Sequence, residues 1–348
     1  MQIFKESKNR EQLILLTEKP EIIKYSPGTP SVTTMISGKK AQLGCMGCLN
    51  PRCIYFTEYE VTCTEVSDFP NDKTLNTCPV DALNWDMSKN QPSINTEKCI
   101  NCGICIRRCP VGALYFDNEI KLNSKLDDCQ QIVAVTEENE RKQAHQLDEA
   151  IKVAKTGKYI KESDLLFENI YEKLTQLTHH FHNPVGRNLL IALGCNCSMR
   201  RIGDVYTRMD AIYSLPEDNI IGAIEIEFGK DTLEASRAIL DDVAVMNTRY
   251  GIDKHLNSPL AVCLQLPNAR QGYWQVVKDI NIVENIKINT ITIGALMLLV
   301  WNGSFFTTKE NNFYLDYDNM NLREIISKFI GENVSITNKF LGILEPEK

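Results

Sequence analysis

The chain has 348 residues and a formal net charge of −7, with 43% hydrophobic and 24% charged residues. These proportions are typical of a globular protein that is long enough to form two or more domains, each with its own core. No apolar run reaches the roughly 18 to 20 residues of a transmembrane helix, and the polar start MQIFKESKNREQ does not resemble a secretory signal. We therefore expect a cytoplasmic protein with no membrane partner. The net charge neither indicates nor excludes a nucleic-acid partner.

Residues 1–35 form a lead segment that ends in the turn-rich stretch SPGTPS, and residues 36–128 contain two copies of one cysteine pattern. The second copy reads CINCGICIRRCPVGALYF, and the first is completed by CPVDALNW after a long interruption. The repeated Cys-Pro tails indicate an internal duplication. CxxC spacing lets neighbouring sulfurs reach adjacent irons of a cluster. These eight cysteines are Cys45, Cys48, Cys53 and Cys78 in the first copy, and Cys99, Cys102, Cys105 and Cys109 in the second.

The duplicated pattern resembles the bacterial two-cluster ferredoxins. In that family the fourth cysteine of each motif ligates the cluster of the other half. The resemblance therefore implies two [4Fe-4S] clusters, one held by Cys45, Cys48, Cys53 and Cys109 and the other by Cys99, Cys102, Cys105 and Cys78. The first motif departs from the family, because it reads CxxCxxxxC and residues 54–77 precede its last cysteine.

Other readings of the cysteines remain open. Paired CxxC motifs also form four-cysteine zinc sites, although CxxCxxC followed by Cys-Pro is not usual zinc spacing. Cys63 lies inside the interruption and competes as a ligand of the first cluster, or packs as an ordinary buried thiol. We expect buried thiols also at Cys129, Cys195, Cys197 and Cys263.

Two helices are expected in the middle of the chain. A polar helical stretch, residues 137–159, lies in a linker of residues 129–160 and ends near Gly157. An amphipathic helix follows over residues 162–184 and is stopped by Pro184. Its apolar face contains Leu166, Ile170, Leu174, Leu177 and Phe181. The histidines of the sequence HHFH at its end read as cap or surface residues rather than as metal ligands.

Residues 161–348 are expected to form an α/β domain with a mixed sheet. An apolar segment at 188–193 comes first, and the runs 204–215 and 220–229 form a hairpin around the turn 216–219. A capping-box pattern at Asp231 and Glu234 starts a helix that ends at Gly251. Two further apolar runs, 259–266 and 288–301, flank a helix near residues 273–277, and Ile291–Trp301 reads as one buried strand.

Acidic residues of the hairpin supply the candidate chemistry of this domain. In the sequence IEIEF, alternation places Glu225 and Glu227 on one face of the strand and Ile226 on the other. Asp210, on the preceding strand, comes opposite them. Three converging carboxylates suit Mg²⁺, which activates water against a phosphodiester. The alternative is an edge of solvated glutamates.

The order helix, hairpin with Asp and then ExE, helix, strand resembles the PD-(D/E)xK nuclease superfamily, the fold of many type II restriction endonucleases. Asp210 and Glu225 match the acids of the family motif, while Glu227 stands where Lys is usual. Lys230 is nearby, but it has the wrong strand parity unless the strand ends at Gly229. The resemblance implies catalysis by Asp210, Glu225 and Glu227 with Mg²⁺, and DNA as a partner. A homodimer is the corresponding expectation for assembly.

The sequence thus predicts an α+β multidomain protein in which a ferredoxin-like domain precedes a restriction-endonuclease-like α/β domain. Its main functional hypothesis is an iron–sulfur-containing, Mg²⁺-dependent DNA endonuclease of restriction or phage-defence type. The alternative is a ferredoxin-type electron-transfer protein whose C-terminal domain docks a redox partner. In that case the three acids are surface charges.

Overall fold

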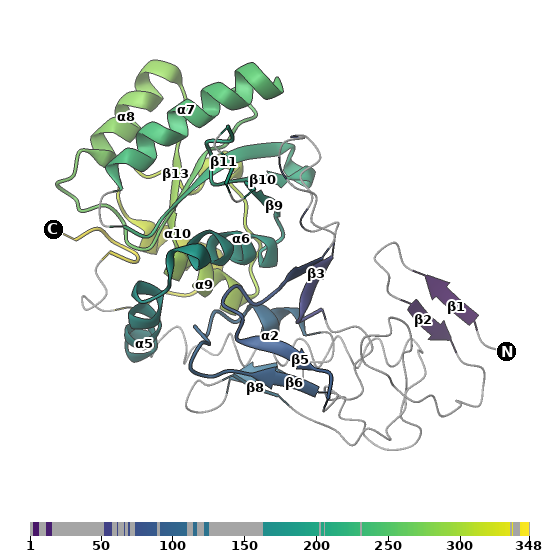
Figure 1. Cartoon of the computed structure of the whole chain (residues 1–348). Helices are drawn as coiled ribbons and strands as arrows, with labels where there is room; N and C mark the ends of the chain where they lie inside the picture. The colour runs from purple at the N-terminus through teal and green to yellow at the C-terminus, as the bar shows by residue number, and fades with distance from the viewer. Residues whose placement is uncertain are drawn as a thin grey trace. The chain divides into compact units, whose positions relative to one another are not determined.

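The structure is a computed structural model, and it divides the chain into two compact units (Figure 1). The N-terminal unit contains residues 1–58 and 74–156, and the C-terminal unit contains residues 59–73 and 157–348. The described residues are 3–6, 12–15, 52–57, 61, 66, 69, 74–88, 91–109, 114–116, 122–124, 163–201, 203–204, 206–229, 232–334, 336 and 342–347. Cys45, Cys48, Cys63, Cys129 and the expected linker helix at 137–159 lie outside these residues.

The described part of the N-terminal unit is made of antiparallel strand pairs and one short helix. The duplication is visible in it, because each Cys-Pro tail leads into a hairpin: β5 begins at Leu83 after Cys78, and β7 begins at Leu114 after Cys109. The pairs are β1 (Ile3–Glu6) with β2 (Gln12–Leu15), β3 (Tyr55–Thr57) with β4 (Thr74–Asn76), β5 (Leu83–Asp86) with β6 (Gln91–Ile94), and β7 (Leu114–Phe116) with β8 (Leu122–Ser124); the helix is α2 (Ile104–Arg108).

The C-terminal unit is an α/β structure around one five-stranded sheet. Its strands are β9 (Asn196–Met199), β10 (Ala211–Leu215), β11 (Ile220–Glu227), β12 (Leu260–Cys263) and β13 (Asn289–Thr292). Its α-helices are α5 (Ser163–Thr175), α6 (His182–Ala192), α7 (Leu233–Tyr250), α8 (Tyr273–Glu284), α9 (Ile293–Asn302) and α10 (Leu322–Ile330), with short 3-10 helices at His179–Phe181, Pro216–Asp218 and Lys309–Asn311.

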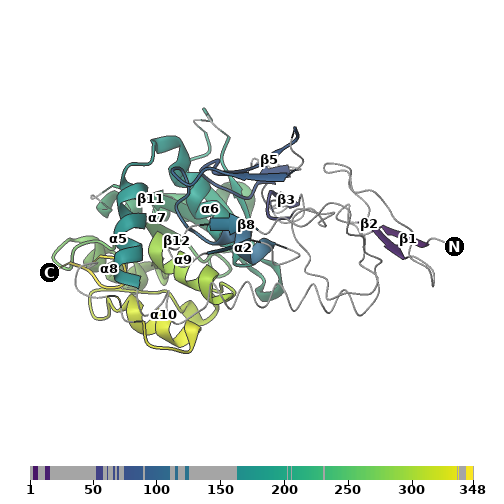
Figure 2. The same cartoon turned by 90° about the horizontal axis from the view of Figure 1, so that it is seen from below.

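The sheet is mixed, as the sequence predicts. Its strand order is β13-β12-β11-β10-β9, with β9, β10 and β11 antiparallel and β11, β12 and β13 parallel. Helices α7 and α8 lie on one side of the sheet, and α6 and α9 lie on the other (Figures 1 and 2). The expected alternation along β11 is confirmed. Ile226 faces Gly186 of α6, whereas Ala223 packs with Val245 of α7.

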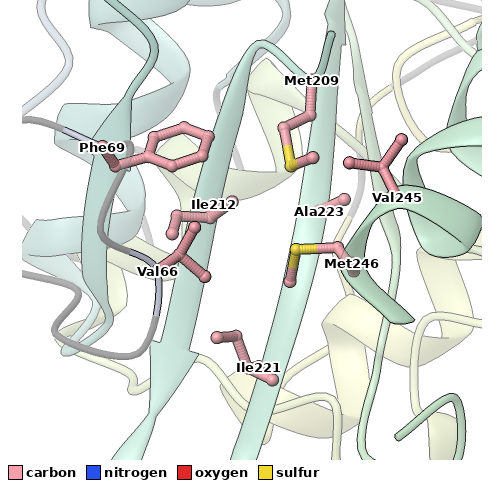
Figure 3. Close-up of a cluster of buried hydrophobic side chains, with 8 residues drawn as sticks. All are labelled: Val66, Phe69, Met209, Ile212, Ile221, Ala223, Val245 and Met246. Carbon is pink, nitrogen blue, oxygen red and sulfur yellow. The ribbon is translucent and has the colours of Figure 1, made fainter. Parts of the chain in front are cut away.

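The interruption of the first cysteine motif contributes to the core of the C-terminal unit. Strands β3 and β4 pair as a hairpin in the N-terminal unit, but the intervening residues 59–73 belong to the C-terminal unit. Val66 and Phe69, 1% and 5% exposed, pack against the α7 side of the sheet (Figure 3). The cluster that they join consists of Met209, Ile212, Ile221, Ala223, Val245 and Met246. Residues 59–73 therefore act as a structural part of the second unit.

The apolar run Ile291–Trp301 is not one strand. It supplies the end of β13 and then the whole of α9, which begins after Thr292. The side chain of Thr292 accepts a hydrogen bond from the Ala295 N–H at 3.1 Å, which is an N-cap contact. Every residue of α9 except Asn302 is buried. Because a helix that is apolar on all sides shows no hydrophobic periodicity, its sequence cannot be distinguished from that of a buried strand.

The expectation of one helix over 162–184 is also wrong. Helix α5 ends at Thr175, and α6 begins at His182 and includes the segment 188–193 up to Ala192. Pro184 therefore lies in the first turn of α6 instead of ending a helix. Proline is tolerated there because the first N–H groups of a helix have no intrahelical partner. By contrast, the expected end of α7 is confirmed, since Gly251 adopts φ 69° as its C-cap.

Candidate cluster site and carboxylate group

One cysteine of the first motif meets three cysteines of the second. Cys78, Cys99, Cys102 and Cys105 line a single pocket together with Val80, Ala82, Leu83, Ile100 and Ile104. Asn101 and Gly103 have positive φ values of 54° and 78°, which bend the backbone around the pocket. The Sγ atom of Cys78 accepts a hydrogen bond from the Ala82 N–H at 3.2 Å. These are the four residues that the family resemblance assigns to the second cluster.

The electrostatics of this pocket favour a positively charged group. Burial raises the pKa of the Cys102 thiol far above its ordinary value, and the nearby Cys78 raises it further. The pKa of Cys105 is raised by burial and then by Cys102, Cys99 and Cys78. Thiolates this close repel one another unless a cation lies between them. Iron binding would therefore release protons from these thiols, because cluster ligands are thiolates. The donors and their setting fit a [4Fe-4S] cluster.

Half of the first ligand set is described. Cys53 and Cys109 are 7% and 2% exposed, and Cys53 lies close enough to Cys105 to raise its pKa. The other two expected ligands, Cys45 and Cys48, are outside the described residues. Cys195, Cys197 and Cys263 are buried in the C-terminal unit, as expected for packed thiols.

Asp210 and Glu225 come together at the β10–β11 pair. Ala211 pairs with Ile224, so the residue before β10 lies beside Glu225. Asp210 accepts a hydrogen bond from the Ile226 N–H at 3.1 Å through Oδ2, and its Oδ1 lies 3.4 Å from a guanidinium nitrogen of Arg200. Burial raises the pKa of Glu225, and the charges of Asp210 and Asp242 raise it further. Glu225 therefore holds its proton near neutral pH.

Asp242 of α7 is a third carboxylate, which the sequence pattern did not predict. It is 1% exposed, and its Oδ2 has no hydrogen-bond partner among the described residues. Burial raises the pKa of Asp242, while a hydrogen bond with Glu225 raises the pKa of Glu225 and lowers that of Asp242. The protonated Glu225 thus donates to the Asp242 carboxylate. The signal available in the sequence was its spacing, because Asp242 stands three residues after Ile239 and three residues before Val245.

The interactions of Glu227 lie elsewhere. Its carboxylate accepts the Gly229 N–H at 2.5 Å, and its charge acts on Cys263 and on His182. His182 stacks on Phe228, with ring centroids 4.1 Å apart. Among the described side chains, no group of three or more Cys, His, Asp or Glu residues is arranged to hold a single metal ion. The carboxylate group, defined here as Asp210, Glu225 and Asp242, is thus not a preformed site in its protonated state.

Comparison with known proteins identifies the chemistry of the first unit. Residues 92–115 match the 4Fe-4S binding domain family. The chain is 41% identical over 49 residues to the polyferredoxin-like subunit of an aliphatic sulfonate oxidoreductase from Pyrococcus furiosus, covering 14% of this chain and 27% of that protein. It is 40% identical over 43 residues to an uncharacterized ferredoxin from Methanocaldococcus jannaschii, covering 12% of this chain and 27% of that protein.

These matches cover only part of this chain and of each relative. The chain spans about a quarter of the length of these relatives, 27% in each case. They establish a ferredoxin-like domain that binds a 4Fe-4S cluster. No solved structure matches the chain. Within the described residues, no helix is both long and apolar enough to cross a membrane.

Proposed function

We propose that this chain, which carries a 4Fe-4S binding domain of the ferredoxin type, is an electron-transfer protein with two [4Fe-4S] clusters. Its C-terminal unit would bind the protein with which it exchanges electrons. The observation that supports this proposal most is the meeting of Cys78 with Cys99, Cys102 and Cys105 in one pocket. A ligand donated by one motif to the cluster of the other is the arrangement of two-cluster ferredoxins. A four-cysteine zinc site does not require that one motif donate a ligand to the site of the other.

The residues around the pocket suit this role. A [4Fe-4S] cluster supplies one-electron transfer when it is bound. The buried side chains of Leu83, Ile100 and Ile104 exclude water from the sulfurs. The Ala82 N–H points its dipole at the Cys78 sulfur, which lowers the cost of adding an electron to a cluster ligated there. Val80 and Ala82 come from the Cys-Pro tail that the duplication repeats.

Iron analysis and voltammetry of anaerobically purified protein test the proposal. We expect about eight Fe per chain, two cubanes, and reversible one-electron reduction at low potential. Cys78→Ala should reduce the iron content to about four, because it removes a ligand of the second cluster only. The control is Cys263→Ala, which removes a fully buried thiol outside the pocket and should leave the iron content unchanged. Wild-type protein that binds zinc in place of iron, or clusters that do not cycle, would refute electron transfer.

A Mg²⁺-dependent DNA endonuclease is the second candidate, and one observation favours it. Asp210 and Glu225 lie together and are joined by Asp242, so three carboxylates face one another on the α7 side of β10 and β11. With Glu225 ionised, these oxygens would suit a hard divalent cation, which would activate water for attack on a phosphodiester. A catalytic role for Glu227, binding of DNA and a homodimeric assembly remain predictions of this candidate.

Incubation with plasmid DNA and Mg²⁺ or Mn²⁺ separates the two candidates. If the chain is a nuclease, Asp210→Ala and Glu225→Ala should each lower cleavage by about 10² or more, because each removes a ligand of the catalytic ion. Glu234→Ala is the control, since it removes an exposed carboxylate from the first turn of α7. If the wild-type protein does not cleave DNA with either metal, the nuclease candidate is wrong and electron transfer stands alone.

A further inference from the structure

Arg108 connects two residues that the family resemblance assigns to the first cluster. It is the last residue of α2 and directly precedes Cys109. Its Nε donates a hydrogen bond to the Arg52 carbonyl at 3.0 Å, and its Nη2 donates to the Tyr55 carbonyl at 3.3 Å. The guanidinium also lies over the Phe56 ring, with 4.4 Å between Cζ and the ring centroid. One side chain of the second motif thus holds the loop of the first motif that contains Cys53.

The Arg52 carbonyl belongs to the peptide bond whose amide is that of Cys53, so a bond to this oxygen orients the cysteine. A second bond reaches the same oxygen from Thr77, whose Oγ1 donates at 3.2 Å. Thr77 is fully buried, and its N–H donates to the Ile54 carbonyl at 2.8 Å. Thr77 directly precedes Cys78, as Arg108 directly precedes Cys109. The residue before the final cysteine of each motif therefore bonds to the peptide of Cys53.

We propose that Arg108 is a positioning residue for the first cluster, which holds Cys53 in place relative to Cys109 and adds a permanent positive charge beside the cluster. The inference rests on the proposed ligand set of Cys45, Cys48, Cys53 and Cys109. The first motif needs such support because four residues, instead of two, separate Cys48 from Cys53. Residues 54–77 then separate Cys53 from Cys78. The short helix α2 supplies a rigid base for the contact.

The contact has two separable parts. The guanidinium forks to two carbonyls and stacks on an aromatic ring, which a lysine ammonium does not reproduce. Its charge stabilises the reduced cluster, which is more negative than the oxidised one, and so raises the reduction potential. Arg108→Lys keeps the charge and loses the fork, whereas Arg108→Met loses both and keeps the apolar stem.

Cluster loss to an iron chelator and a redox titration followed by electron paramagnetic resonance test the proposal in the full chain. For Arg108→Met we expect one cluster to be lost roughly 10-fold or more faster than in wild type, with a plateau near four Fe per chain. Before that loss, the potential of one cluster should become more negative. Arg108→Lys should also lose one cluster faster, but with its potential near that of wild type.

Lys98→Met is the matched control. It removes a positive charge next to Cys99, but from an exposed side chain, so cluster loss should match wild type. The proposal is overturned if Arg108→Met keeps wild-type chelator resistance and potentials, or if both clusters are lost together. The first of these results, with about eight Fe in the wild type, leaves the proposed function intact. A wild type with only four Fe overturns the ligand set and this inference together.

Discussion

Near neutral pH, the buried Glu225 keeps a proton that an exposed glutamate would release. The residue is buried beside two carboxylates, and its hydrogen bond to Asp242 exists only in the protonated form. Arg200 lies 3.4 Å from Asp210 and offsets part of the negative charge. Arg208 also acts on Asp242, so one proton and two guanidinium groups offset the negative charge, and a divalent cation would have to displace that proton. Binding of Mg²⁺ to this group should therefore strengthen as the pH rises.

Glu225 should make the stability of the C-terminal unit depend on pH. Its folded-state pKa is raised above the ordinary value of 4.5, so above that pH the folded state holds a proton that the unfolded state releases. Stability is then lost as the pH rises, by about 1.4 kcal/mol per pH unit while only the unfolded state is ionised. Glu225→Gln keeps the donor to Asp242 and should remove most of this slope.

Urea unfolding at pH 5.5 and pH 8 measures the effect, with the fluorescence of the buried Trp274 and Trp301 as the signal. The wild type should be less stable at pH 8, and Glu225→Gln should be the more stable of the two proteins there. Equal slopes in both proteins would mean that Glu225 is ionised in the folded state.

The sequence predicted two residues of the carboxylate group and missed the third for a physical reason. Strand alternation and a hairpin turn fix which face Glu225 occupies and which residue lies opposite it. Asp242 comes from a helix, and the capping pattern of α7 gives its ends but not its rotation about the sheet. Arg108 was likewise visible only as one of two basic residues after Cys105, because its partners are backbone carbonyls about fifty residues away.

At the scale of elements, Thr292 determines where β13 ends and α9 begins. Its Oγ1 accepts the Ala295 N–H at 3.1 Å and donates to the Ile343 carbonyl at 2.7 Å, in a buried setting. The junction is not visible as a break in the apolar pattern, because the residues on both sides of it are apolar. A threonine inside such a run is a candidate N-cap and therefore a possible helix start.

Thr292→Val should lower the free energy of unfolding by about 1 to 3 kcal/mol, because the isosteric change leaves a buried donor and a buried acceptor without partners. Unfolding in urea with far-ultraviolet circular dichroism measures this loss. Thr248→Val is a suitable comparison, since the Thr248 hydroxyl bonds to Ala244 on the exposed side of α7; its effect should be smaller. A neutral Thr292→Val would show that the cap contributes little to the junction.

At the scale of the whole molecule, the interruption of the first cysteine motif has a role that its position in the sequence conceals. It lies between Cys53 and Cys78, so the ferredoxin pattern makes it look like an insertion into the cluster domain. Its buried residues instead complete the core of the C-terminal unit, beside the strand that begins after Asp210. Local patterns did not predict this, because docking depends on contacts with residues more than 130 positions away.

Phe69→Ala should therefore destabilise the C-terminal unit by about 3 to 5 kcal/mol, the usual cost of truncating a buried phenylalanine. Phe69 is 5% exposed and packs among the buried hydrophobic side chains shown in Figure 3. Urea unfolding gives the loss, and iron analysis of the same sample should show an unchanged cluster content. Tyr55→Ala, in β3 ahead of residues 59–73 and 49% exposed, should have a much smaller effect on stability. Loss of iron without loss of stability would show that Phe69 supports the N-terminal unit instead of the core of the C-terminal unit.

A fragment of residues 157–348 should be incomplete for the same reason. Without residues 59–73 it exposes the apolar side chains that Val66 and Phe69 cover, among them Met209, Ile212 and Met246. We expect the fragment to bind a hydrophobic dye, to unfold at lower urea concentration than the same unit in the full chain, and to aggregate at higher concentration. A synthetic peptide of residues 59–73 should reduce dye binding in a saturable way, whereas the same peptide with Val66 and Phe69 replaced by Asp should not. A fragment as stable as the intact unit, with no dye binding, would show that the interruption is dispensable for this core.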